Sequence, residues 1–310
     1  MPEIHLLVPC SAQKTSSAPE KMCFSKHNTA DLNQSLNSWL DAFNQTSERH
    51  PTSRLYNGQA FLYAKKLAEK SQFKLSILSA GFGLVTSNTE LPSYNATFSA
   101  NKDRVPSPQS SWWSSVCQSD LPGTSIFEYV NAHSEDQFIF CLSNEYLRAV
   151  QDDLLSALEN DAFDNERIVI ISSNVPKKLK AYECRFVKTS RNILNHSKAK
   201  ESGLAISDRN VTSIALYMFV EQLRLTKTPF SAIIPALNED FAKLKPTFKP
   251  KRAVQPIELI KEFIWNEICD STKPVSATSI LRKYRDSGFA CSVERFGEFY
   301  KQVKSEKGLS

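Results

Sequence analysis

Short apolar runs alternate with amphipathic stretches along the first three quarters of the chain. Four runs are rich in β-branched and aromatic residues and predict buried strands, at 3–10, 74–79, 136–143 and 167–173. Between them, apolar residues three or four positions apart predict helices at 29–44, 61–68, 144–160 and 210–225. Strands that alternate with helices predict a three-layer α/β domain with a parallel or mixed sheet.

The pattern changes near residue 235. The stretch 236–256 carries three spaced prolines and five lysines and arginines, which is typical of an extended linker. Three amphipathic segments follow, at 257–269, 276–288 and 291–307. We therefore predict an α/β domain at 1–234, a linker at 235–256 and a small all-α domain at 257–310.

The positive charge is concentrated in this tail. The chain carries a net charge of +5, and residues 241–310 hold 14 lysines and arginines against 8 acidic residues, which leaves 24 against 25 elsewhere. A basic module on a neutral body indicates a polyanionic partner such as DNA, although solubility alone explains the charge equally well. Two helices joined by a short glycine-containing turn favour a helix-turn-helix. Its expected phosphate contacts are Arg282, Lys283, Arg285, Lys301 and Lys304.

Composition excludes several classes of protein. No apolar run approaches the ~20 residues of a membrane span, so no membrane partner is expected. The seven cysteines include no CxxC pair, which favours free thiols in a reducing, cytoplasmic setting. The five histidines show no paired ligand spacing, and there is no Walker or GxGxxG motif. We therefore expect neither a metal nor a cofactor.

Two stretches suggest chemistry. Cys10 follows the first strand, where α/β sheets place ligand sites, and a nearby ammonium such as that of Lys14 favours the nucleophilic thiolate. An ordinary buried thiol is the alternative. The predicted strand at 74–79 leads into Gly81 and Gly83, one residue apart, which allow positive φ or close approach to a ligand. A simple turn with a surface loop would show the same pattern.

These motifs resemble those of the YaaA-like superfamily over residues 1–225. The matching positions are Tyr56 and Gly58 before a helix, 78–84 at a strand end, Tyr94, and the strand-helix junction 138–150. Ser93 separates Pro92 from Tyr94, unlike the family's Pro-Tyr. The segment PCSAQK is similar to the Pro-Cys-Ser-x-x-Lys motif of archaeosine synthases, which act on 7-cyano-7-deazaguanine in tRNA. Here Thr15 and Ser16 replace the Pro-Tyr that follows in that family.

The superfamily also includes DNA-modification components of the DpdC type. This resemblance implies an enzyme that hydrates the nitrile of 7-cyano-7-deazaguanine in DNA to the amide through a cysteine thioimidate, with other modification-system proteins as partners. Its expected catalytic residues are Cys10, Lys14 and His27. Its expected substrate contacts are Ser11, Tyr56, Gly58, Ser79, Gly81, Gly83, Tyr94, Asn95, Ser143, Asn144 and Glu145. Of these, Ser79, the amides of residues 81–83 and Asn95 would orient the base or hold developing charge. Ser143, Asn144 and Glu145 would hydrogen-bond the guanine edge, and Tyr94 or a tryptophan would stack on the base.

Two other functions remain open at this point. A non-enzymatic YaaA-like DNA-binding protein would bind through basic residues of the body, namely Lys102, Arg104, Lys177, Lys178 and Lys180, and would not need Cys10. A nucleoside or base hydrolase of nucleotide salvage or phage defence would act on free nucleosides and would not need the tail.

Overall fold

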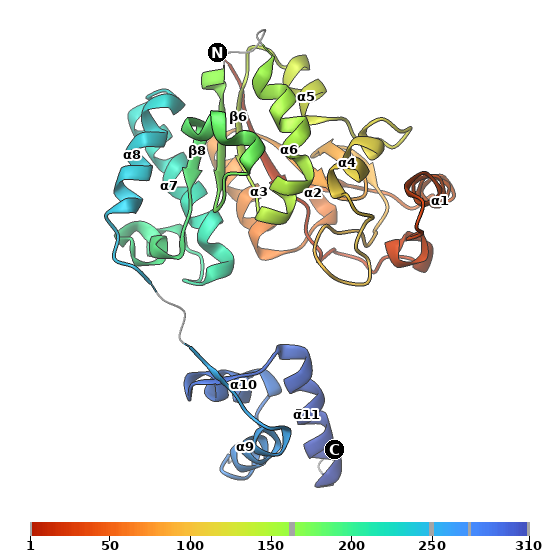
Figure 1. Cartoon of the computed structure of the whole chain (residues 1–310), viewed down its shortest axis with the longest axis vertical. Coiled ribbons are helices and arrows are strands. Elements are labelled where there is room, and N and C mark those ends of the chain that lie inside the picture. Colours follow the sequence, from red (N-terminus) through yellow and green to blue (C-terminus); the bar gives the residue numbers. More distant parts are fainter. Residues whose placement is uncertain (1, 161–164, 248–250, 272–273, 309–310) are drawn as a thin grey trace. The chain divides into compact units, whose positions relative to one another are not determined.

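The protein comprises two compact units, residues Met1–Thr247 and Phe248–Ser310 (Figure 1). The structure is a computed structural model, and it describes residues 2–160, 165–247, 251–271 and 274–308. In that part of the chain no helix is both long and apolar enough to cross a membrane.

A six-stranded sheet forms the centre of the first unit, with strand order β4-β3-β1-β6-β7-β8. The strands are β1 Ile4–Pro9, β3 Lys74–Ser79, β4 Gly83–Thr86, β6 Gln137–Cys141, β7 Ile168–Ser172 and β8 Phe186–Lys188. Strands β3 and β4 pair antiparallel, and the other neighbours in this sheet pair parallel. A separate pair joins β2 His50–Pro51 to β5 Glu90–Leu91. The predicted α/β fold with a mostly parallel sheet is therefore confirmed.

Helices cover both faces of this sheet. The helices are α1 Leu32–Asn44, α2 Thr52–Leu55, α3 Gln59–Ser71, α4 Gln109–Cys117, α5 Ile126–Ala132, α6 Asn144–Glu159, α7 Val211–Thr226 and α8 Phe230–Ala242. Strands β3 and β7 lie on opposite sides of the β1–β6 pair. Because crossovers between parallel strands are right-handed, α3 and α6 must cover opposite faces. The strand order therefore produces three layers.

The predicted linker begins too early. Residues 235–242 belong to α8, which continues through Pro235 and buries Ile233, Ile234, Leu237 and Phe241. A proline inside a helix removes one backbone hydrogen bond. Burying four large apolar side chains, at ~1.5–3 kcal/mol each, more than offsets that loss. The proline count favoured a linker, whereas the apolar spacing of this segment was helical.

The second unit has its own hydrophobic core. It contains α9 Ile257–Cys269, α10 Ala277–Asp286 and α11 Val293–Glu306, which bury Ile260, Ile264, Tyr284 and Phe296 among themselves. Ser276 caps α10, because its side chain accepts a hydrogen bond from the amide of Ser279. A parallel pair of two-residue strands, β9 Ala253–Val254 and β10 Phe289–Ala290, adds to the expected helices.

Candidate active site at the carboxyl edge of the sheet

A cavity of about 390 Å³ opens where β1 and β6 end side by side. Chain connections leave this pair in opposite directions, to β3 on one side and β7 on the other. Such switch points are where α/β sheets bind ligands. The cavity lining includes Cys10 and Ser11 after β1, Ser143 after β6, and Gly58 before α3.

Cys10 is the nucleophilic group in this cavity. Its backbone amide donates to the carbonyl of Leu78 at 2.9 Å, which ties it to the end of β3. Its Sγ lies 3.0 Å from the hydroxyl of Tyr146, on the first turn of α6. The thiol is only partly buried. The Cys10 thiol can therefore be reached from the cavity, although the residue also packs against the core. Cys141 lines the same cavity, but it is buried, and burial raises its pKa to about 12.

Lys14 lies behind Cys10 rather than in the cavity wall. Its Nζ donates to the carbonyl of Ser11 at 3.1 Å and lies 4.3 Å from the centre of the Tyr94 ring. Burial lowers the pKa of Lys14, and the negative potential of the nearby Cys10 opposes that change. Lys14 therefore loses its proton more readily than a surface lysine does.

Three buried tyrosines complete the polar network. Tyr56 and Tyr94 share a hydrogen bond of 2.9 Å between their hydroxyls, and Tyr94 shares another of 2.6 Å with Ser79 Oγ. Burial raises the pKa values of Tyr56, Tyr94 and Tyr146 well above that of free tyrosine. All three phenols are consequently neutral at physiological pH, and Tyr146 is placed to donate a hydrogen bond to a thiolate at Cys10.

The amino ends of two helices also meet the cavity. Gln59 and Ala60, in the first turn of α3, line it, and Ser143 caps α6 beside it. Helix amino ends carry partial positive charge and orient amides toward anions. Arg209, which is exposed, contributes a guanidinium to the same wall.

Gly58 is required by this arrangement. A Cβ at position 58 would lie 2.1 Å from Ser11 Oγ, well inside contact distance. The loop after β1 and the start of α3 approach each other closely only because this residue has no side chain.

Several predicted residues thus come together. Cys10, Ser11, Gly58 and Ser143 line one cavity, and Lys14, Tyr56, Ser79 and Tyr94 form the network behind it. The sequence analysis missed Tyr146 and Arg209. The helical pattern identified Tyr146 only as a buried residue, and Arg209 carries no local signal at all.

His27 is not part of this group. Its Nδ1 bonds with Ser38 Oγ and its Nε2 with the carbonyl of Lys21, both at 2.7 Å. The ring packs edge-on against Trp39 at 5.4 Å. Both nitrogens are thus engaged in holding the loop before α1, and the expected role of His27 as an acid beside Cys10 does not fit the structure.

The glycine turn is core rather than a ligand loop. The Trp39 and Trp112 indoles donate to the carbonyls of Gly81 and Ala80, each at 2.7 Å. The amide of Gly81 donates to Ser79 Oγ at 3.2 Å, and Gly83 has a φ of +76° at the start of β4. These groups face the protein interior, so the expectation that Gly81 and Gly83 hold developing charge is wrong.

The expected base-stacking and guanine contacts also lie elsewhere. Tyr94, Trp112 and Trp113 are buried in the core, where other side chains cover their rings. Asn95 pairs through its backbone with the loop around Cys23, and its Nδ2 lies 3.5 Å from Cys23 Sγ. Asn144 accepts a hydrogen bond from Ser173, and within the described chain Glu145 is exposed outside the cavity lining.

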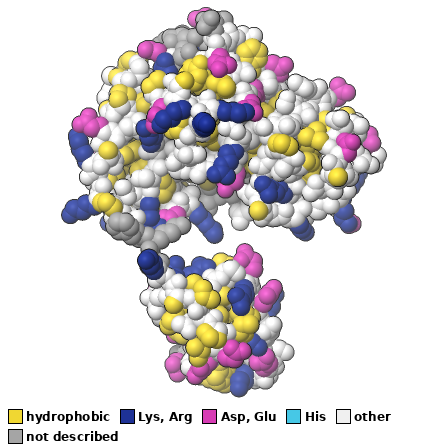
Figure 2. Space-filling view, viewed as in Figure 1, with side chains coloured by type: hydrophobic (Ala, Val, Ile, Leu, Met, Phe, Trp, Pro, Cys, Tyr) yellow, Lys and Arg dark blue, Asp and Glu magenta, His cyan; other side chains and the backbone are white. Residues whose placement is uncertain are grey.

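The basic residues expected to contact phosphate are partly engaged with their own unit. Arg282 pairs with Asp286 at 4.0 Å, Lys283 with Glu267 at 2.5 Å, and Arg285 donates to the carbonyl of Cys291. Basic and acidic side chains are interspersed over the visible face of this unit (Figure 2). Exposed ion pairs contribute little stability, so a phosphate can compete for these cations.

A model of a family of unknown function, DUF6884, matches residues 42–165 of the chain. The matched segment includes Tyr56, Gly58, Ser79, Tyr94 and Tyr146, and it begins after Cys10 and Lys14. No curated protein and no solved structure matches the chain. Over the segment that carries the tyrosines of the site, the chain is therefore similar to a family for which no activity is known.

Proposed function

We propose that the protein is a YaaA-like DNA base-modification enzyme that hydrates the nitrile of 7-cyano-7-deazaguanine to the amide through Cys10. One observation carries the proposal: a partly buried thiol lies in a cavity at the switch point of the sheet, 3.0 Å from a neutral phenol. The resemblance of PCSAQK to the archaeosine synthase motif supplies the substrate class.

In this mechanism the Cys10 thiolate adds to the nitrile carbon and one C≡N π bond breaks. The nitrogen takes a proton, which gives a thioimidate. Water then adds to the carbon, and the tetrahedral adduct expels the thiolate to form the amide. The net reaction adds one water to the nitrile, and the enzyme is regenerated.

In this mechanism Tyr146, and not His27, is the group that favours the amide as the product. The adduct can lose either the thiolate or ammonia, and the amide requires loss of the thiolate. A phenol 3.0 Å from Sγ stabilises the departing sulfur by hydrogen bonding. Lys14 adds positive charge behind the same atom, and water in the cavity supplies the proton for the nitrogen.

The cavity suits one base with its phosphate. Its volume of about 390 Å³ lies within the ~300–1,000 Å³ typical of small-ligand pockets. The helix amino ends and Arg209 favour an anionic group at its mouth. A base inside duplex DNA would have to rotate out of the stack to reach Cys10, and the basic second unit would hold the surrounding phosphates.

The test is mass spectrometry of nucleosides from cyano-deazaguanine DNA incubated with the full chain. We expect a gain of one water on the modified base, and loss of that product in Cys10→Ala. Cys184→Ala is the matched control, because Cys184 is exposed and lies outside the cavity lining. Full turnover by Cys10→Ala would refute covalent catalysis. An unchanged base with salt-dependent DNA binding would favour a non-enzymatic DNA-binding protein.

A further inference from the structure

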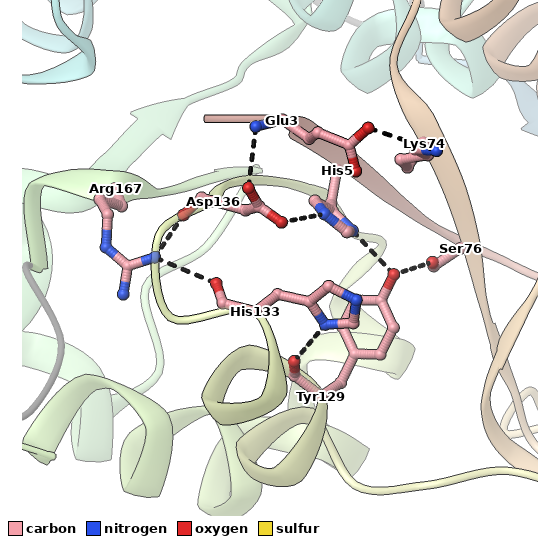
Figure 3. Close-up of polar contacts among 8 residues, drawn as sticks. All are labelled: Glu3, His5, Lys74, Ser76, Tyr129, His133, Asp136 and Arg167. Atoms are coloured by element: carbon pink, nitrogen blue, oxygen red, sulfur yellow. Dashed lines mark hydrogen bonds and ion pairs between the residues drawn. The ribbon is translucent and has the colours of Figure 1, made fainter. Parts of the chain in front are cut away.

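A second polar cluster lies at the opposite end of β1. Glu3 and His5 flank the start of this strand, and His133 and Asp136 precede β6 (Figure 3). His5 and Cys10 are five positions apart, which corresponds to about 17 Å along a strand. The cluster is therefore distinct from the cavity described above.

The geometry of the cluster suits one cation. The ligand atoms of Glu3, His5 and Asp136 all lie within 4.8 Å of one another. His5 Nε2 is 3.0 Å from Asp136 Oδ2, and the Glu3 amide holds the other carboxylate oxygen at 2.8 Å. Ligands at ~2.0–2.2 Å from a tetrahedral zinc lie ~3.4 Å apart, so the side chains need only small movements.

His133 lies beside this set. Its ring centre lies 4.7 Å from that of His5, and its Nδ1 donates to the backbone carbonyl of Tyr129 at 2.8 Å. Its nitrogens are not among the three ligand atoms that lie within 4.8 Å of one another, so His133 borders the site.

The hydrogen bonds of His5 allow it to lose its Nε2 proton. Tyr129 OH lies 2.7 Å from His5 Nδ1 and 2.8 Å from Ser76 Oγ (Figure 3). Hydroxyls both donate and accept, so this chain supports either tautomer of the imidazole. A metal on Nε2 displaces the proton that is now shared with Asp136, and Nδ1–H then donates to Tyr129.

The remaining contacts of the cluster agree with this inference. The Glu3 carboxylate forms an exposed ion pair with Lys74 at 3.3 Å, and such a pair gives way readily. Two carboxylates and one imidazole match the preferences of divalent transition metals.

The cluster is also accessible. Glu3, His5, Tyr129 and His133 line a cavity of about 450 Å³. We propose that Glu3, His5 and Asp136 bind one divalent transition-metal cation at the amino-terminal edge of the sheet. The cavity supplies an entry path and leaves a coordination position facing solvent.

The test is titration of the full chain with Co²⁺ and then Zn²⁺, followed by absorption and calorimetry. Cobalt distinguishes this site from the free cysteines, because thiolate ligands add a sulfur-to-cobalt charge-transfer band that imidazole and carboxylate ligands lack. We expect one Co²⁺ per chain without that band, and displacement of cobalt by Zn²⁺.

Two variants and one control assign the ligands. Glu3→Gln and Asp136→Asn should each weaken cobalt binding at least tenfold, and the side-chain carbonyl in Asp136→Asn can still accept the hydrogen bond from the Glu3 amide. His50→Ala is the control, because His50 pairs with Glu48 on the surface, away from the cluster. Circular dichroism of the metal-free proteins verifies folding. No binding by the parent chain, a thiolate band, or an affinity within twofold of the parent in either ligand variant would overturn the proposal.

Discussion

Tyr146→Phe isolates the contribution of one hydroxyl to the reactivity of Cys10. The substitution deletes the group that lies 3.0 Å from Sγ and retains the ring, which packs edge-on against Phe98 at 4.9 Å. Stability should change little, because a neutral hydrogen bond contributes ~0.5–1.5 kcal/mol. Thiol reactivity should change more, because the thiolate is a charged acceptor.

Hydrogen bonds to charged groups contribute ~1.5–3 kcal/mol. In Tyr146→Phe the thiolate loses this hydrogen bond completely, whereas the transition state of its reaction with iodoacetamide loses only part of it. The alkylation rate of Cys10 at neutral pH should therefore fall by up to ~10–100-fold. The assay is site-resolved alkylation, in which peptide mass spectrometry follows Cys10 and uses the exposed Cys184 and Cys269 as internal references.

Tyr300→Phe is the matched control. Its hydroxyl donates to the carbonyl of Val275 at 2.6 Å in the second unit, so this variant loses a comparable bond away from Cys10. Cys10 should react at the parental rate in Tyr300→Phe and more slowly in Tyr146→Phe. An alkylation rate in Tyr146→Phe within twofold of the parent would refute the inference that Tyr146 stabilises the thiolate.

Three further predictions concern stability and pH, each measured by urea denaturation. Burial lowers the pKa of Lys14 from 10.5 in the folded protein. At pH values below the lowered pKa, the buried ammonium therefore destabilises the folded state. This destabilisation decreases as the pH rises and vanishes above pH 10.5. Lys14→Met should therefore raise the free energy of unfolding at pH 7, and a gain that does not shrink toward pH 10.5 would contradict this cause. The Asp153 carboxylate accepts hydrogen bonds from the Trp113 indole and from two backbone amides at the start of α5. Asp153→Ala should therefore lower the free energy of unfolding by ~3–5 kcal/mol. A decrease below about 1 kcal/mol would contradict that role. Trp39→Phe leaves the buried carbonyl of Gly81 without its indole donor and should cost ~2–3 kcal/mol, whereas an unchanged midpoint would mean that the β3–β4 turn does not depend on this bond.

The two ends of β1 illustrate how much a local pattern indicates. The run after Glu3 predicts a buried strand, and a strand in a parallel sheet brings Cys10 to the ligand-binding edge. The same pattern assigns His5 only to the strand. The polar cluster around His5 forms only because β6 pairs with β1 and places Gln137 beside Ile4. This pairing brings Asp136 and His133 close to His5.

Linear spacing does not reveal the proposed metal site. His5 and His133 are far apart in the chain, and each has a carboxylate two or three residues away, at Glu3 and Asp136. Spacing rules detect ligands that share one helix or loop. They do not detect a set that is assembled from two neighbouring strands.

Proximity in sequence was equally misleading for His27. His27 follows Cys10 by 17 positions, yet the loop between them places its ring against Ser38 and Trp39. The imidazole is stable in that position because both its nitrogens have hydrogen-bond partners and its ring contacts an aromatic side chain. Tyr146, which is 136 positions away, lies in contact with the thiol instead.

The sequence by itself determined the elements of this protein: the buried strands, the amphipathic helices, the Ser276 cap and the location of Cys10 after a strand. These features depend on hydrophobic periodicity and capping, which act over a few residues. The tertiary structure alone decided the strand order, and with it the meeting of Cys10 with Tyr146 and of His5 with Asp136. The physical reason is that strand order minimises the free energy of the whole packed domain, and no local pattern contains that information.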